Sequence, residues 1–336
     1  MGTAAQIRIT RGGHLESTHR VHAVVTTEAH TLMQWGDPDR LTFMRSSAKP
    51  LQSLPLVEDG VLEPLGLGDE ALVLATASHN SEMIHIQGVR QMLEAIGGSE
   101  GQLECGGHEP LDRETAEARI RAGERFSAID SNCSGKHAGM LALCGHHGWP
   151  TEGYRLAGHP VQERIRGIIS EWSGIAEGDL ATAVDGCGVP CFGVPLQVMA
   201  RIFARYARES RDPLCGPGRI TSAIRSHPVL LAGRKRLCSD IVLATGGRVL
   251  AKIGAEAVYS AWIPDDGSGR SVGVGIKVED GGRRAIEVAL VAVLRAAGLL
   301  SASELTSLPR YVRPVVKNTR GEVVGEIAFE QGVVDG

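Results

Sequence analysis

The arrangement of secondary structure that the sequence predicts is β at both ends of the chain and α between them. Runs rich in Val, Ile and Tyr and bounded by turn residues predict strands, at residues 20–27, 30–35, 41–44, 248–253, 257–263, 271–278 and 322–329. Apolar residues that recur every three and four positions predict helices, at residues 82–96, 114–121, 136–144, 161–172, 195–207 and 284–297. We therefore expect an α+β fold, in which one antiparallel sheet is built from both termini around a helical insertion lobe.

This arrangement implies two lobes. A chain of 336 residues has room for two domains of about 150 residues each. We expect residues 1–60 and 246–336 to form a sheet lobe, and residues 61–245 to form a mainly helical lobe. The two lobes should make one compact unit with a cleft where they meet.

Composition and charge exclude several classes of function. A net charge of −4 and an aromatic content of 4% do not supply the basic surface and stacking platforms of a nucleic-acid binder. The most apolar stretch, residues 286–300, contains Glu287 and Arg295 and is too short to cross a bilayer. The first residues form no apolar signal segment, and the seven cysteines are an odd number. We therefore expect reduced thiols in a cytoplasmic protein with no membrane partner.

The first motif with chemical content is Ser46-Ser47-Ala48-Lys49. A serine and a lysine three positions apart at the start of a helix share one face, so the amine can lie beside the hydroxyl. An amine whose pKa is lowered by burial or by a second cation can then activate the serine. The alternative is an exposed serine and lysine, because S-x-x-K occurs by chance in many long chains.

Two further motifs are Ser78-His79-Asn80 and Lys252-Ile253-Gly254. The first follows the apolar run 71–77 and can mark the edge of a cleft; equally, Ser78 or Asn80 can cap the helix expected after Glu82. In the second, Gly254 allows a substrate or a neighbouring backbone to approach closely; the alternative is an edge-strand lysine that discourages aggregation.

The three motifs together resemble those of penicillin-binding proteins and serine β-lactamases, which carry S-x-x-K, S-x-N and K-x-G in this order. That resemblance implies a two-lobed fold with a site built from serine and lysine. The spacing between the motifs differs from that of those enzymes, so the resemblance does not identify the substrate.

The fourth motif is Cys133-Ser134-Gly135-Lys136-His137. It is not a phosphate-binding loop, because Asp130 and His137 stand where that loop requires Gly and Ser or Thr. Thiolates from Cys133 and Cys187 are suitable ligands for zinc. The alternative is that both cysteines are simply small buried residues, since the chain has no C-x-x-C pair.

Four segments together closely resemble the rhizobial-type (class 3) L-asparaginases, the family often called asparaginase II; they are residues 45–52, 133–138, 185–190 and 252–256. The likeness extends from about Arg8 to about Phe329. It implies a serine β-lactamase-like fold, usually as a homodimer, and hydrolysis of L-asparagine to L-aspartate and ammonia. It also implies zinc as the cofactor, with no organic cofactor.

The same resemblance implies roles for individual residues. Two Ser-Lys pairs, Ser46 with Lys49 and Ser78 with Lys252, would carry the catalysis, with Ser46 as the nucleophile. The matching zinc ligands are Cys133, Lys136 and Cys187. The positions expected near the substrate are Arg45, Asn80, His137, Asp185 and Cys238.

One loop departs from the family pattern. The family tends to carry Ser-Gly-Glu-Pro after Ser78-His79, whereas this chain has Asn80-Ser81-Glu82-Met83. The departure bears on amide preference, and two alternatives to asparaginase activity stay open. One is a glutaminase or a β-lactamase-like hydrolase of the same fold, and the other is a non-enzymatic thiolate-zinc module.

Overall fold

The computed structural model describes residues 3–331, and its contacts divide the chain into two compact units. The sheet unit contains the residues up to Ser47, Val194–Arg208 and the residues from Ile241 onward; the helical unit contains Ala48–Gly193 and Glu209–Asp240. Residues 48–60 thus group with the helices and residues 194–208 with the sheet, whereas the lobe boundaries predicted from the sequence lie at residues 60 and 246.

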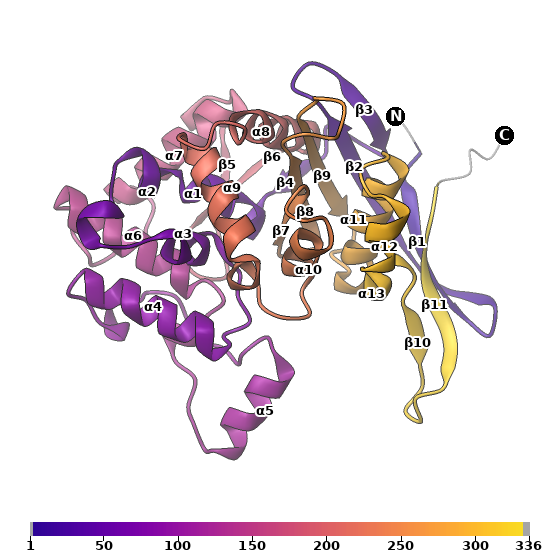
Figure 1. Cartoon of the computed structure of the whole chain (residues 1–336), viewed down its shortest axis with the longest axis horizontal. Helices are drawn as coiled ribbons and strands as arrows, with labels where there is room; N and C mark the ends of the chain where they lie inside the picture. The colour runs from indigo at the N-terminus through magenta and orange to yellow at the C-terminus, as the bar shows by residue number, and fades with distance from the viewer. Residues whose placement is uncertain (1–2, 332–336) are drawn as a thin grey trace. The chain divides into compact units, whose positions relative to one another are not determined.

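The sheet unit is built around one antiparallel sheet with strand order β10-β11-β1-β2-β9-β8-β7 and with β3 paired to β2 (Figure 1). Strands from the N-terminal part are β1 (Ala5–Arg11), β2 (His14–Thr26), β3 (Thr31–Trp35) and, outside this sheet, β4 (Leu41–Phe43). Those from the C-terminal part are β7 (Leu250–Gly254), β8 (Val258–Ile263), β9 (Val272–Val278), β10 (Val315–Lys317) and β11 (Val323–Glu330). Val21 of β2 pairs with Val278 of β9, and Ile7 of β1 with Phe329 of β11. The two termini therefore contribute to one sheet, as predicted.

Glycines on β9 allow a helix to pack closely on the sheet. A Cβ at Gly273 would overlap the backbone of α8 (Leu196–Glu209) at Ala200 and Ala204. Beside this contact, Trp262 of β8 lies against two aromatic rings of α8, with centroids 5.9 Å from Phe203 and 5.4 Å from Tyr206. The alternation of Gly with Val and Ile in β9 thus gives one strand a flat face for a helix and a branched face for the core.

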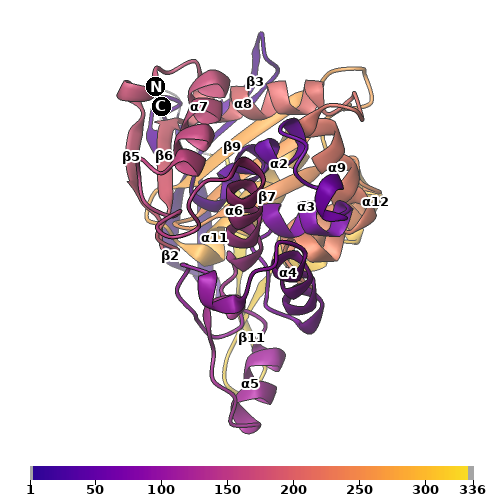
Figure 2. The ribbon, with the colours of Figure 1, turned by 90° about the vertical axis from the view of Figure 1, so that its left-hand side faces the viewer.

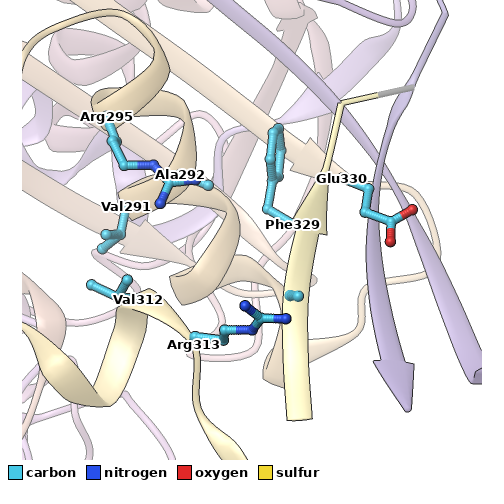
Figure 3. A pocket seen from close by; sticks show the side chains of 8 residues that line it. Val291, Ala292, Arg295, Val312, Arg313, Phe329 and Glu330 are labelled. Carbon is cyan, nitrogen blue, oxygen red and sulfur yellow. The ribbon is translucent and has the colours of Figure 1, made fainter. Parts of the chain in front are cut away.

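Helix α11 (Arg283–Ala296) also packs on the sheet, with contacts to β9 and β11. A cavity of about 200 Å³ lies between α11, α13 (Pro309–Val312) and β11, close to α12 (Ala302–Thr306). Figure 3 shows the side chain of Arg295 extending toward the ring of Phe329 there. The residues predicted to be functional do not line this cavity.

The helical unit contains α1 (Lys49–Gln52), α2 (Leu54–Glu58), α3 (Asp69–Thr76), α4 (Met83–Ala95), α5 (Arg113–Arg121), α6 (Ser134–His147), α7 (Pro160–Ser173) and α9 (Gly216–Ser226). It also contains β5 (Ala181–Val184), which pairs with β6 (Pro190–Pro195), and the start of α10 (Leu237–Ala244). Helices α3, α4 and α6 contact one another (Figure 2). A Cβ at Gly135 would overlap the carbonyl oxygen of Leu74, and one at Gly139 would lie 3.1 Å from the Cβ of Ala75. These glycines therefore let α6 approach α3 closely.

The expected fold class is confirmed as α+β, with one antiparallel sheet from both termini and a helical insertion. Several elements were not predicted, among them β1, α3 and α9. Among residues 3–331 we find no helix with the length and apolar character that crossing a membrane requires.

Candidate active site

Lys49 is a fully buried lysine at the first position of α1. Its Nζ lies 3.1 Å from Ser78 Oγ and 3.4 Å from the carbonyl oxygen of Asn132, and it also donates to the carbonyl oxygen of Ala77. Burial lowers the pKa of Lys49, because desolvation penalises the charged amine. A neutral amine in this position has two N–H groups for the two carbonyls and a lone pair for the hydroxyl of Ser78.

The loop that carries Ser78 is held by backbone hydrogen bonds. Ser78 N–H donates to Leu231 O at 3.1 Å, and His79 N–H donates to Asn132 O at 3.2 Å. The alternative that Ser78 or Asn80 caps α4 is wrong, since Glu82 is the N-cap residue and no side chain caps this helix. The polar triplet is therefore a loop that brings Ser78 to Lys49.

The serine of the first motif lies in the sheet unit beside the strand of the second lysine. Ser46 is half-buried, and its hydroxyl has no hydrogen-bond partner within the described part of the chain. Lys252 is fully buried on β7, and its Nζ donates to Ile253 O at 3.1 Å. A Cβ at Gly254 would lie 2.6 Å from Met44 O, so the absence of a side chain there lets the segment leading to Ser46 lie against β7.

Arg45, which precedes Ser46, adopts φ 50°. A non-glycine residue in this left-handed region costs on the order of 1–2 kcal/mol. Backbone strain of this kind is concentrated at functional sites, which agrees with a functional role for the neighbouring serine.

The side-chain amide of Asn80 forms hydrogen bonds with other residues of the protein. Its Nδ2 donates to Glu82 Oε1 at 3.3 Å and to Arg234 O at 3.1 Å, while its Oδ1 accepts from Arg236 at 2.6 Å. The amide thus fastens the Ser78 loop to the 234–236 segment. The substrate-binding role expected for Asn80 stays a prediction.

Three further candidates meet at the start of α6. The thiols of Cys133 and Cys187 shift each other's pKa, and Lys136 Nζ lies 3.1 Å from Cys187 Sγ. The interaction with Cys187 lowers the pKa of Cys133, and the interaction with Cys133 together with burial raises the pKa of Cys187. Burial opposes the charge on Lys136, but the two sulfur atoms raise the pKa of this amine. Among residues 3–331, no three side chains of the types His, Cys, Asp and Glu gather as a metal site, so two thiols and an amine are the donor set here.

Three other residues expected near the substrate lie on three different elements. His137 is fully buried on α6, and burial lowers its pKa well below the usual value. Asp185 is half-buried in the turn between β5 and β6, where its Oδ1 accepts from Gly186 N at 2.6 Å. Cys238 is buried near the start of α10.

A serine-histidine contact lies close to the Lys49–Ser78 contact but cannot activate a nucleophile. His79 Nε2 lies 3.0 Å from Ser134 Oγ, and His79 Nδ1 accepts from Ser81 N–H at 3.2 Å. Because Nδ1 is the acceptor, Nε2 carries the proton and donates to Ser134. His79 is therefore not a base for Ser134.

The family model described as L-asparaginase II matches residues 7–329 of the chain. The chain belongs to the L-asparaginase II family. This confirms the family resemblance of the four segments, and membership supports an amidohydrolase. No curated protein sequence matches the chain.

Two solved structures with some similarity to the chain are glutaminases. A Bacillus glutaminase is 12% identical with a TM-score of 0.38, over 83% of this chain and 91% of that one. A probable glutaminase from Bacillus subtilis, complexed with 6-diazo-5-oxo-L-norleucine, is also 12% identical with a TM-score of 0.38, over 83% of this chain and 84% of that one. Likeness at this level carries no weight, and the assignment rests on the L-asparaginase II family model.

The loop that departs from the pattern of the L-asparaginase II family keeps a backbone suited to glycine. Ser81 stands where that family tends to carry Gly, and it adopts φ 63°. Its Oγ donates to Asp130 O at 2.6 Å. This hydrogen bond offsets part of the cost of the left-handed backbone.

Tyr154 was missed by the sequence analysis. Its hydroxyl lies 2.7 Å from His137 Nδ1 and accepts from Glu104 N–H at 2.9 Å. No motif marks a tyrosine 17 positions from its histidine, so only the fold identifies this contact.

Proposed function

We propose that the protein hydrolyses the side-chain amide of L-asparagine to L-aspartate and ammonia, through a serine activated by a neutral lysine. The observation that carries the proposal is the fully buried Nζ of Lys49, 3.1 Å from Ser78 Oγ. Family membership supports an amidohydrolase, and a desolvated lysine beside a hydroxyl is the pairing that such chemistry needs.

In the proposed reaction, Ser46 Oγ attacks the amide carbon and Lys49 is the base that takes the hydroxyl proton. In the structure the hydroxyl that contacts Lys49 Nζ is that of Ser78, so we propose that Ser46 reaches the amine when the substrate is bound. The proton then passes to the leaving nitrogen, and ammonia departs from the acyl-serine. Water attacks the ester carbon, aspartate leaves, and the serine hydroxyl is restored. The charge of Lys136 lowers the pKa of Lys49 further, because like charges repel, and Lys252 is the second amine that we propose for the site.

The proposed substrate contacts come from Arg45, Asn80, His137, Asp185 and Cys238. A guanidinium at position 45 suits the α-carboxylate of an amino acid, and a carboxylate at position 185 suits its ammonium group. The homodimer that the family resemblance implies stays a prediction.

We further propose zinc as the cofactor, held by Cys133, Lys136 and Cys187. Two thiols that shift each other's pKa and an amine 3.1 Å from one sulfur form a donor set of two S and one N, which suits zinc. When bound, the ion would supply positive charge that organises the substrate pocket. Lys136 would have to be neutral in that state.

The direct test is ammonia release from asparagine by the Ser46→Ala and Lys49→Met variants. Both should lose activity by at least 100-fold, the usual contribution of general-base catalysis being about 10² to 10⁴. Lys235→Met is the matched control, because this lysine is exposed and pairs with Glu114. Full activity in both active-site variants would reject the mechanism.

Kinetics on asparagine, glutamine and a chromogenic β-lactam separate the substrate classes. We expect the highest kcat/KM for asparagine, and a higher value for either alternative would overturn that assignment. Mass spectrometry of trapped acyl-enzyme locates the ester, which we expect on the peptide that contains Ser46 and not on the one with Ser78. A non-enzymatic zinc module would instead bind metal without hydrolysis and would be unaffected by Lys252→Ala.

A further inference from the structure

The hydroxyl of Tyr154 occupies a fully buried position between a backbone amide and a histidine. It accepts a hydrogen bond from Glu104 N–H at 2.9 Å and lies 2.7 Å from His137 Nδ1. A phenol has one hydrogen to donate. Within residues 3–331, Nδ1 is the one acceptor within reach of that hydrogen, so Tyr154 donates and His137 Nδ1 accepts.

This direction determines which nitrogen of His137 carries the proton. If Nδ1 accepts, the ring hydrogen is on Nε2. Nε2 is buried and has no hydrogen-bond partner in the described structure. An unsatisfied buried donor costs about 1–3 kcal/mol, so a buried Nε2–H group without a partner needs an explanation.

His79 provides an internal comparison. It has the same tautomer, since Nδ1 accepts from Ser81 N–H, but its Nε2–H is used on Ser134 Oγ. The Nε2–H of His137 has no such partner and is available to a ligand. An N–H group donates to an acceptor, so a ligand there would present an oxygen to Nε2.

We propose that Tyr154 is a positioning residue that holds His137 in the Nε2–H tautomer, so that the ring donates a hydrogen bond to an oxygen of the bound amino-acid amide. The identity of that oxygen as part of the substrate rests on the proposed function. The tautomer itself depends only on the contacts of Tyr154. Replacing the hydroxyl leaves Nδ1 without its donor, so the ring can then place its hydrogen on either nitrogen.

The first test is two-bond ¹H–¹⁵N correlation NMR of the full-length protein labelled with ¹⁵N-histidine. The His137 signals are assigned by their loss in His137→Gln. We expect the Nε2-protonated pattern in the wild type and a mixture or the Nδ1-protonated form in Tyr154→Phe. An Nδ1-protonated ring in the wild type would overturn the proposal, whether or not the protein hydrolyses asparagine.

The second test is kinetic and uses a double-mutant cycle. Tyr154→Phe should lower kcat/KM for asparagine about tenfold, the effect of one buried hydrogen bond, mainly through KM. In the His137→Gln background the same change should have no further effect, because an amide N–H₂ donates without any tautomer. An equal loss in both backgrounds would mean that Tyr154 acts only through packing and would overturn the proposal. The wild-type NMR result decides the tautomer even if Tyr154→Phe does not fold.

Discussion

Lys49 of the S-x-x-K motif contacts Ser78 of the S-x-N motif, with 3.1 Å between Nζ and Oγ across 29 positions of sequence. The contact lies wholly within the helical unit. Two motifs that are each weak evidence in the sequence thus form one cluster, and the buried amine in it has a lowered pKa.

Lys49 should make both activity and stability depend on pH. The pKa of Lys49 in the folded protein lies below 10.5, the usual value, which we take for the unfolded chain. At a pH between the folded and the unfolded pKa, the unfolded chain therefore binds more protons than the folded one. The free energy of unfolding therefore rises with pH in this range, by at most about 1.4 kcal/mol per pH unit, and this gain is lost as pH falls through the folded pKa. Activity should also fall as pH falls through the folded pKa of Lys49, because the protonated amine cannot take the proton of the serine hydroxyl.

Urea titrations over a pH series test this prediction. The difference in unfolding free energy between the wild type and Lys49→Met should increase with pH toward 10.5. In Lys235→Met, which alters an exposed lysine, the curve should run parallel to that of the wild type. A parallel curve for Lys49→Met as well would contradict the prediction.

Gly135→Ala should destabilise the protein by about 3 kcal/mol, because the new methyl group overlaps Leu74 O and forces α6 away from α3. Gly145→Ala on the same helix is the matched control. Its Cβ meets nothing within 4 Å, so it should stabilise by about 0.5–1 kcal/mol through helix propensity. Thermal unfolding of the two variants measures both effects, and similar melting temperatures would contradict the packing argument.

Two substitutions of Ser81 distinguish the cost of backbone strain from the loss of a side-chain hydrogen bond. Ser81→Ala and Ser81→Gly both remove the bond to Asp130 O, but only glycine adopts φ 63° without strain. The glycine variant should therefore be more stable than the alanine variant by about 1 kcal/mol. Denaturant unfolding of the pair checks this, and equal stabilities would show that the left-handed backbone costs nothing here.

Elemental analysis tests the proposed zinc site. Protein purified without chelator should contain about one zinc per chain, as three converging donors imply, and Cys187→Ser should lose it. Cys215→Ser is the control, because this half-buried thiol donates to Glu209 O in a different part of the helical unit. Absence of metal from the wild type would remove the zinc proposal and leave the serine-lysine mechanism intact.

The elements that the sequence predicts well are those with a clear apolar period. The helix expected at 284–297 is α11 at Arg283–Ala296, and the strand expected at 271–278 is β9 at Val272–Val278. Helix α3 was missed because six of its eight residues are buried, so it shows no amphipathic period. Strand β6 begins and ends with proline, which normally argues against a strand.

The candidate site could be predicted only as a set of residue types. Spacing alone does not place Ser78 against Lys49, because that contact depends on the loop that Asn80 ties to Arg234 and Arg236. Gly135 and Lys136 match part of a phosphate-binding loop, whereas in the structure Gly135 allows the close contact between two helices. Close packing of backbone against backbone leaves no pattern other than the glycine itself.

The pairing of β2 with β9 has a consequence for synthesis of the protein. Val21 is synthesised long before its partner Val278, so the apolar strand β2 waits with an open edge until β9 has been made. Such an edge invites pairing with other nascent chains, and pairings this distant in sequence form slowly. Overproduction at low temperature or with a chaperone should accordingly raise the yield of native protein, and fragments that end before β9 should aggregate.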